Sequence, residues 1–115
     1  MDLIVEVYRV TKGFPTHERY GLTAQMRRAA VSISSNIAEG HGRKHLGDYL
    51  HQLSVANGSL MEIETQLLIS GRLGYVSAAD LGDLLHQTAD VGRMLAGLIR
   101  ALKQRLAQQR VSISR

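Results

Sequence analysis

Cysteine and tryptophan are absent from this sequence of 115 residues, and phenylalanine and proline occur once each. Without cysteine there is no disulfide framework and no thiolate metal site, which fits a reducing, cytoplasmic environment. With so few aromatic residues, the core must be aliphatic. Because proline interrupts helices, the single Pro15 leaves long stretches free to be helical. No apolar run approaches the roughly 20 residues of a membrane span, so we expect no membrane partner.

Acidic residues are missing from the last part of the chain. The whole sequence carries 14 Lys and Arg against 10 Asp and Glu, but the last acidic residue is Asp90. Residues 91–115 therefore have a net charge of +6, whereas residues 1–90 have a net charge of −2. Such a segment is a candidate surface for an acidic partner, either nucleic acid or an acidic protein.

Four amphipathic segments follow one another in the chain. Glycine and proline separate them at Gly13–Pro15, Gly40–Gly42 and Gly71–Gly74. The apolar spacing predicts helices over about residues 3–12, 22–39, 46–71 and 78–108, and the last of these has a heptad-like seam. No segment alternates as a half-buried strand would. The sequence predicts one all-α domain over residues 1–115, an antiparallel up-and-down four-helix bundle with a short first helix.

The second predicted helix and its flanks read FPTHERYGLTAQMRRAAVSISSNIAEGHGRKH, at residues 14–45. This run is similar to the four helix bundle proteins also described as 23S rRNA-intervening sequence proteins, whose genes were first noticed in inserts within bacterial 23S rRNA genes. Further matches are GSLMEIETQL at residues 58–67 and LGY at residues 73–75. The resemblance covers essentially the whole chain.

The resemblance implies a bacterial four-helix bundle that assembles as a ring, a pentamer. It also implies kinship with the accessory variability-determinant protein of diversity-generating retroelements, a basic pentamer that binds nucleic acid and a reverse transcriptase. Two features depart from the family pattern. Ser34 stands where the family usually has proline, and the usual longer first helix with an aromatic residue near its start is missing. The family has no settled biochemical function.

A polar ridge runs beside the apolar stripe of the second predicted helix, and its members recur at steps of three and four. On the third predicted helix, Asn57 and Glu64 fall within the apolar stripe. A buried carboxylate needs a partner, and Arg28 or Arg27 is the expected donor. We interpret these residues as a structural polar network or, alternatively, as a ligand-binding site. The ridge consists of Gln25, Arg28, Ser32, Asn36 and Glu39.

The segment from His41 to His45 predicts a basic loop. Two histidines four residues apart can share a helix face, but Gly42 indicates a loop and no third ligand is evident, so we predict no metal site. Arg43 and Lys44 are candidates for contacting phosphate, and the alternative is an ordinary solvated loop.

The fourth predicted helix is the best nucleic-acid candidate. Arg93 and Arg100 point away from its seam, Lys103 and Arg110 lie to one side of them, and Arg105 flanks the other. Such a face predicts salt-sensitive, largely sequence-independent binding of RNA or DNA, to which Arg27 could add. The alternative is a soluble helix end whose cations favour the helix dipole. The tyrosines are expected in or near the core, so base stacking should not dominate.

Catalytic patterns are absent from the sequence. No serine stands in a motif with histidine, and no Glu-x-x-His pair suggests a carboxylate-bound iron site. We therefore expect a non-enzymatic, cofactor-free, ring-forming bundle that binds nucleic acid through basic patches. The alternative is a protein–protein adaptor or structural oligomer without a nucleic-acid role.

Overall fold

The computed structural model describes residues 2–114, which form four α-helices and one short 3₁₀ turn. The elements are α1 (Asp2–Thr11), η1 (Thr16–Glu18), α2 (Leu22–His41), α3 (Leu46–Arg72) and α4 (Ala78–Ser114). No strand occurs within residues 2–114. The predicted all-α bundle is confirmed. The main difference is in α4, which continues to Ser114 instead of ending near residue 108.

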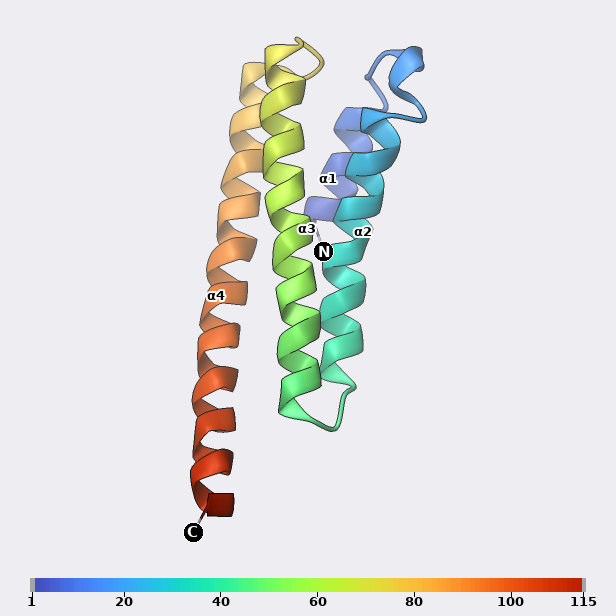
Figure 1. Cartoon of the computed structure of the whole chain (residues 1–115). Coiled ribbons are helices and arrows are strands. Elements are labelled where there is room, and N and C mark those ends of the chain that lie inside the picture. Colours follow the sequence, from blue (N-terminus) through green and yellow to red (C-terminus); the bar gives the residue numbers. More distant parts are fainter. Residues whose placement is uncertain (1, 115) are drawn as a thin grey trace.

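Successive helices run in opposite directions (Figure 1). α2 packs against α1 and α3, and α4 packs against α3 and α1, so the four helices form a square in cross-section. The bundle measures 60 × 24 × 19 Å, and its long axis is the direction of α4. None of the helices in residues 2–114 combines the length and the apolar character that crossing a membrane requires.

The core is aliphatic, as the low aromatic content predicts. Each fully buried aliphatic side chain contributes roughly 1.5–3 kcal/mol relative to the exposed state. Phe14 is buried at the α1–α2 connection and packs against Tyr75, with ring centroids 5.4 Å apart. Tyr20 differs from the expectation, because it is 87% exposed in that same connection. The largest fully buried apolar residues are Val7, Met26, Ile33, Leu53, Ile63, Leu67, Leu84 and Leu95.

Polar contacts hold the short α1 to both of its neighbours. The Arg27 Nε of α2 donates to Thr11 Oγ1 at 2.9 Å, and the Arg27 guanidinium lies 4.7 Å from the Tyr8 ring centroid. On the other side, Arg9 Nη2 pairs with Asp80 Oδ1 of α4 at 2.9 Å. The hydrogen bond from Arg9 lowers the pKa of Asp80 below its ordinary value. α1 is therefore short but fixed in place.

The α3–α4 connection is capped at both of its ends. Gly74 has φ +76°, the left-handed conformation that favours glycine. Tyr75 N donates to Ser70 O and Gly74 N donates to Gly71 O, which together form a Schellman motif at the end of α3. Ser77 Oγ then accepts the backbone N–H of Asp80 at 3.1 Å and caps the start of α4.

The register between α3 and α4 is fixed by close contacts at two glycines. Gly71 of α3 faces Leu81 of α4, and Gly92 of α4 faces Leu60 of α3. Continuing this antiparallel register places Leu46, at the start of α3, opposite Leu106. The last residues of α4 therefore extend past the first residue of α3, as Figure 1 shows.

Candidate nucleic-acid interface and the α2–α3 groove

Exposed cations occupy the second half of α4. Arg100, Lys103 and Arg105 are exposed, and within residues 2–114 none of them has an ion-pair partner. Arg93 differs, because it pairs with Asp90 one turn before it. Asp90 also lies 3.6 Å from His86 Nε2. The charge available to an anionic partner therefore lies mainly beyond Arg93.

The loop between α2 and α3 lies at the same end of the bundle (Figure 1). By the α3–α4 register, its cations Arg43 and Lys44 are level with the residues of α4 that follow Leu106. Arg43 Nη2 is 3.4 Å from Glu39 Oε1 in an exposed contact, and such pairs contribute little. The two predicted basic segments thus lie toward the same end of the bundle. We call this set of residues the basic end: Arg43, Lys44, Arg100, Lys103, Arg105 and Arg110.

Among the shallow cavities on this part of α4, two are lined by cations. One, of about 380 Å³, is lined by Asn57, Ala96, Ile99, Arg100 and Lys103. The other, of about 410 Å³, is lined by Arg105, Gln108, Gln109 and Ser112. Each cavity places amide side chains beside cations, and both groups donate hydrogen bonds to phosphate oxygens.

Arg27 lies apart from the basic end. It is half-buried in the first part of α2, where Thr11 and Tyr8 hold its guanidinium. The structure therefore gives Arg27 a contact role between α1 and α2 and does not bring it together with the other candidate phosphate-binding residues.

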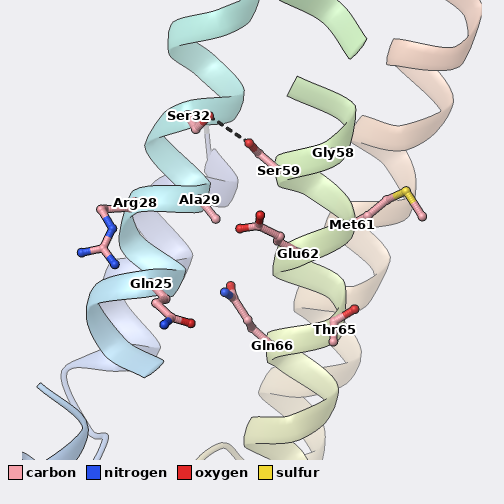
Figure 2. Close-up of a pocket in the computed structure, with 10 residues that line it drawn as sticks. All are labelled: Gln25, Arg28, Ala29, Ser32, Gly58, Ser59, Met61, Glu62, Thr65 and Gln66. Atoms are coloured by element: carbon pink, nitrogen blue, oxygen red, sulfur yellow. Dashed lines mark hydrogen bonds between the residues drawn. The ribbon is translucent and has the colours of Figure 1, made fainter. Parts of the chain in front are cut away.

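The polar ridge of α2 lines a groove against α3 (Figure 2). This α2–α3 groove has a volume of about 790 Å³. From α2 it is lined by Gln25, Arg28 and Ser32, and from α3 chiefly by Ser59, Glu62 and Gln66. The α3 residues recur at steps of three and four, like those of α2. Sequence analysis missed them, although this matching spacing was the signal that could have revealed them.

Beyond the groove, the ridge of α2 continues through Asn36 and Glu39, and Ser32 connects it to α3. Ser32 Oγ and Ser59 Oγ are 2.8 Å apart and bridge the two helices. Asn36 Nδ2 donates to Ser32 O at 2.8 Å and to Ser32 Oγ at 3.0 Å. Glu39 lies further along α2, where it pairs with Arg43. The ridge is therefore partly a structural network and partly the wall of a groove.

The expected role of Asn57 and Glu64 was wrong. Glu64 is exposed, and no ion pair joins it to Arg27 or Arg28. Asn57 lines a cavity with residues of α4, and Glu64, two turns later, lies on that same side of α3. The buried stripe of α3 separates both residues from α2. The carboxylate that lines the groove with Arg28 is Glu62.

Gln66 is the most unusual residue of the groove. It is 9% exposed, and its Oε1 atom is buried without a hydrogen-bond partner in the described residues. Leaving such an acceptor unsatisfied costs about 1–3 kcal/mol. Gln87 Oε1 shares this property, but Gln87 is only half-buried and lines none of the cavities described above. Gln66 is thus an unpartnered acceptor placed in a polar groove.

Residues 2–114 hold no group of three or more His, Cys, Asp or Glu side chains placed to bind a metal ion. The fold and site define a class of protein: an antiparallel four-helix bundle with a polar groove between α2 and α3 and a basic end on its last helix.

The chain belongs to the 23S rRNA-intervening sequence protein family, whose model matches residues 1–97. The match ends before Arg100, so most of the basic part of α4 lies beyond it. A solved structure from Bacteroides thetaiotaomicron VPI-5482, described as a protein with unknown function from the S23 ribosomal protein family, has the same fold. It superposes with a TM-score of 0.79 at 19% identity, covering 86% of this chain and 89% of that one. No curated protein matches this sequence.

Proposed function

We propose that this protein binds nucleic acid through the basic end of the bundle, as a homo-oligomer and without enzymatic activity. The observation that supports this most strongly is the set of three exposed cations on α4, Arg100, Lys103 and Arg105, that have no ion-pair partner within residues 2–114. The adjoining loop adds Arg43 and Lys44, so cations from two segments of the chain face solvent together.

The spacing of these cations suits a phosphate backbone. A helix rises about 1.5 Å per residue, so the ten residues from Arg100 to Arg110 extend about 15 Å along α4. One DNA strand carries a phosphate every 3.4 Å or so along its axis, so this distance covers roughly four phosphates. Contacts of this kind bind without reading sequence, and they weaken as salt concentration rises.

Base stacking has little to support it at the basic end. The tyrosine closest in sequence to the loop, Tyr49, is half-buried and lies against His41, with its hydroxyl 3.4 Å from His41 Nδ1. The fully exposed Tyr20 lies in the connection between α1 and α2, at the opposite end of the bundle. A duplex is therefore a better ligand for this surface than a single strand held by stacked bases.

Self-association has separate support from an exposed apolar stripe on α3, formed by Met61, Leu68, Ile69 and Leu73. Leu68 and Ile69 also line an apolar cavity of about 500 Å³ with Leu81. Contiguous exposed apolar surface of this kind marks interaction sites. We infer that the stripe joins copies of the chain, consistent with the pentameric ring that the family resemblance implies. A ring would repeat the basic end on each subunit and add weak contacts together.

The oligomer is tested by light scattering coupled to size-exclusion chromatography. Leu68→Glu should reduce the molar mass toward that of a monomer, because it places a charge in the apolar stripe. Val5→Glu is the control, since Val5 is also an exposed apolar residue, 65% exposed against 49% for Leu68, but lies on α1. A monomeric wild-type protein would contradict the oligomer without affecting the nucleic-acid proposal.

The nucleic-acid proposal is tested by fluorescence anisotropy with short labelled RNA and DNA duplexes at about 50 and 200 mM salt. The triple variant Arg100→Gln, Lys103→Gln, Arg105→Gln should bind more weakly and lower the salt slope by up to about 2.7, or 0.9 for each lost phosphate contact. The matched control is Lys12→Gln, Arg19→Gln, Arg72→Gln, which removes three exposed cations at the opposite end.

Equal losses in the two triple variants would contradict a localised interface. Absence of binding at low salt would overturn the proposal and favour the alternative, a protein–protein adaptor.

A further inference from the structure

The α2–α3 groove lies apart from the basic end, and it contains a carboxylate and a buried amide oxygen that accept no hydrogen bond from residues 2–114. We propose that it is a binding site for a guanidinium group, which is held between the Glu62 carboxylate and the side-chain oxygen of Gln66. The inference does not depend on nucleic-acid binding, because Glu62 and Gln66 do not belong to the basic end.

Glu62 and Gln66 are one helical turn apart, so their side chains leave α3 on the same face. Figure 2 shows both pointing from α3 toward α2, with their polar ends next to each other in the groove. Both offer oxygen acceptors to the groove, and neither has a hydrogen-bond or ion-pair partner within residues 2–114. Glu62 is exposed and can be hydrated, whereas the buried Gln66 oxygen has no donor, so a donor placed between the two would satisfy both.

Arg28 does not supply that donor. It lines the same groove, but in Figure 2 its guanidinium extends away from α3, and no ion pair joins it to Glu62. In the proposal, the donor comes from a bound molecule.

A guanidinium fits the two acceptors better than other cations do. Its planar fork carries five N–H donors and can bond a carboxylate and a neighbouring amide oxygen at once. It is also less strongly hydrated than an ammonium, which suits a site where Gln66 is almost fully buried. A single carboxylate is a poor site for a divalent cation, which prefers several charged oxygen ligands.

The α2 side of the groove indicates which second chemical group the ligand carries besides its guanidinium. Gln25 and Arg28 line the α2 side of the groove, and the exposed Arg28 side chain can turn toward a bound carboxylate and donate to it. A molecule with a guanidinium at one end and an anion at the other would contact both walls. Free arginine has this chemistry, and so does an arginine in a peptide with a nearby acidic group, so the experiment must distinguish the two sources.

The chemistry of Gln66 argues against a purely structural role. Leucine would fill nearly the same volume there without an unsatisfied oxygen, and sites that break such local rules are commonly functional. Gln66→Leu is therefore expected to raise the melting temperature while it removes guanidinium binding. A fall in melting temperature would mean that the amide is structural and would contradict the proposal.

The binding test is a ¹H–¹⁵N NMR titration of the purified protein that follows the side-chain NH₂ signals of Gln25 and Gln66. The probes are L-arginine, the blocked peptide acetyl-Gly-Arg-Gly-amide, and L-citrulline, which has the shape of arginine without its charge. Arginine or the peptide should shift the signals at millimolar concentration, and citrulline should not. Absence of shifts with both arginine probes, or equal shifts with citrulline, would overturn the proposal.

Two matched variants locate the site. Glu62→Gln should weaken binding roughly tenfold or more, as expected for loss of a charged hydrogen-bond acceptor. Glu64→Gln changes an exposed neighbour that does not line the groove and should have no effect on binding. Equal effects of the two variants would contradict the site.

Arg28→Gln should weaken the binding of free arginine more than the binding of the blocked peptide if free arginine is the ligand. Duplex binding by Glu62→Gln should be unchanged, which separates this test from that of the basic end.

Discussion

The two halves of α4 share one continuous helix but differ in charge, packing and surroundings. Residues 78–90 contain three acidic residues and no Lys or Arg, whereas residues 91–114 contain five Lys or Arg and no acidic residue. α1 runs antiparallel to α4 from the Arg9–Asp80 pair, and its ten residues extend about 15 Å, as far as Gln87. The first half therefore packs between α1 and α3, and the second half has α3 beside it.

This difference separates stability from binding within one helix. In the first half, Leu84 and Thr88 are buried and Asp80 anchors α1. In the second half, Leu95 and Leu102 still bury one face against α3, while the remaining faces present cations. A surface that binds an anionic partner needs exposure, and the short α1 leaves that exposure available.

The largest expected difference between the two halves of α4 is in the free energy lost when a core leucine is truncated to alanine. Leu84→Ala should lower the free energy of unfolding by about 3 kcal/mol, because helices on both sides limit collapse of the cavity. Leu102→Ala should cost about half as much, since the surrounding side chains can relax toward solvent. Urea unfolding of both variants measures the two values. Equal losses would mean that the second half is held as tightly as the first.

A pair of glycine substitutions gives a smaller contrast. A Cβ at Gly97 would meet no atom within 4 Å, so Gly97→Ala should raise the free energy of unfolding by about 0.5–1 kcal/mol through helix propensity. A Cβ at Gly71 would lie 2.6 Å from Leu81 Cδ2, at the first half of α4. Gly71→Ala should therefore give no gain, because Leu81 must move. A stabilising Gly71→Ala would show that this contact is loose.

Removal of the end of α4 should have a still smaller effect. A chain ending at Arg105 loses residues that are exposed as far as Ser112 and, apart from Leu106, bury little surface. Its free energy of unfolding should change by less than about 1 kcal/mol, as measured by urea unfolding against the full chain. Loss of cooperative unfolding would contradict this expectation.

The smallest expected effect is a loss of stability at acidic pH, where Asp80 becomes protonated. The pKa of Asp80 is lower in the folded protein than its ordinary value of 3.8, chiefly because Arg9 donates a hydrogen bond to it. A lowered pKa stabilises the fold above the ordinary value, and this contribution is lost as pH falls through the folded value. Asp80→Asn should therefore lower the melting temperature at pH 7 but not near pH 2. Asp83→Asn is the control, because Asp83 has no ion-pair partner within residues 2–114. Equal effects at both pH values would contradict the linkage.

The elements of the bundle could be predicted because their signals are local. Glycine and proline mark the connections, Ser77 caps α4, and the apolar spacing identifies buried residues such as Leu84 and Leu95. The groove could not be predicted in the same way. Asn57 and Glu64 flank the same apolar stripe as Glu62 and Gln66, and only the rotation of α3 within the bundle decides which pair faces α2. The contact of Arg27 with Tyr8 likewise depends on where α1 docks.

α4 continues without a break beyond the point where α3 begins, and this makes the helix useful as a rigid spacer. A helical segment appended after Ser114 would inherit its direction, and each added residue would turn the attached group by about 100° and advance it by about 1.5 Å. Fluorophores attached in this way would report the spacing and relative orientation of subunits in an assembly without touching the core.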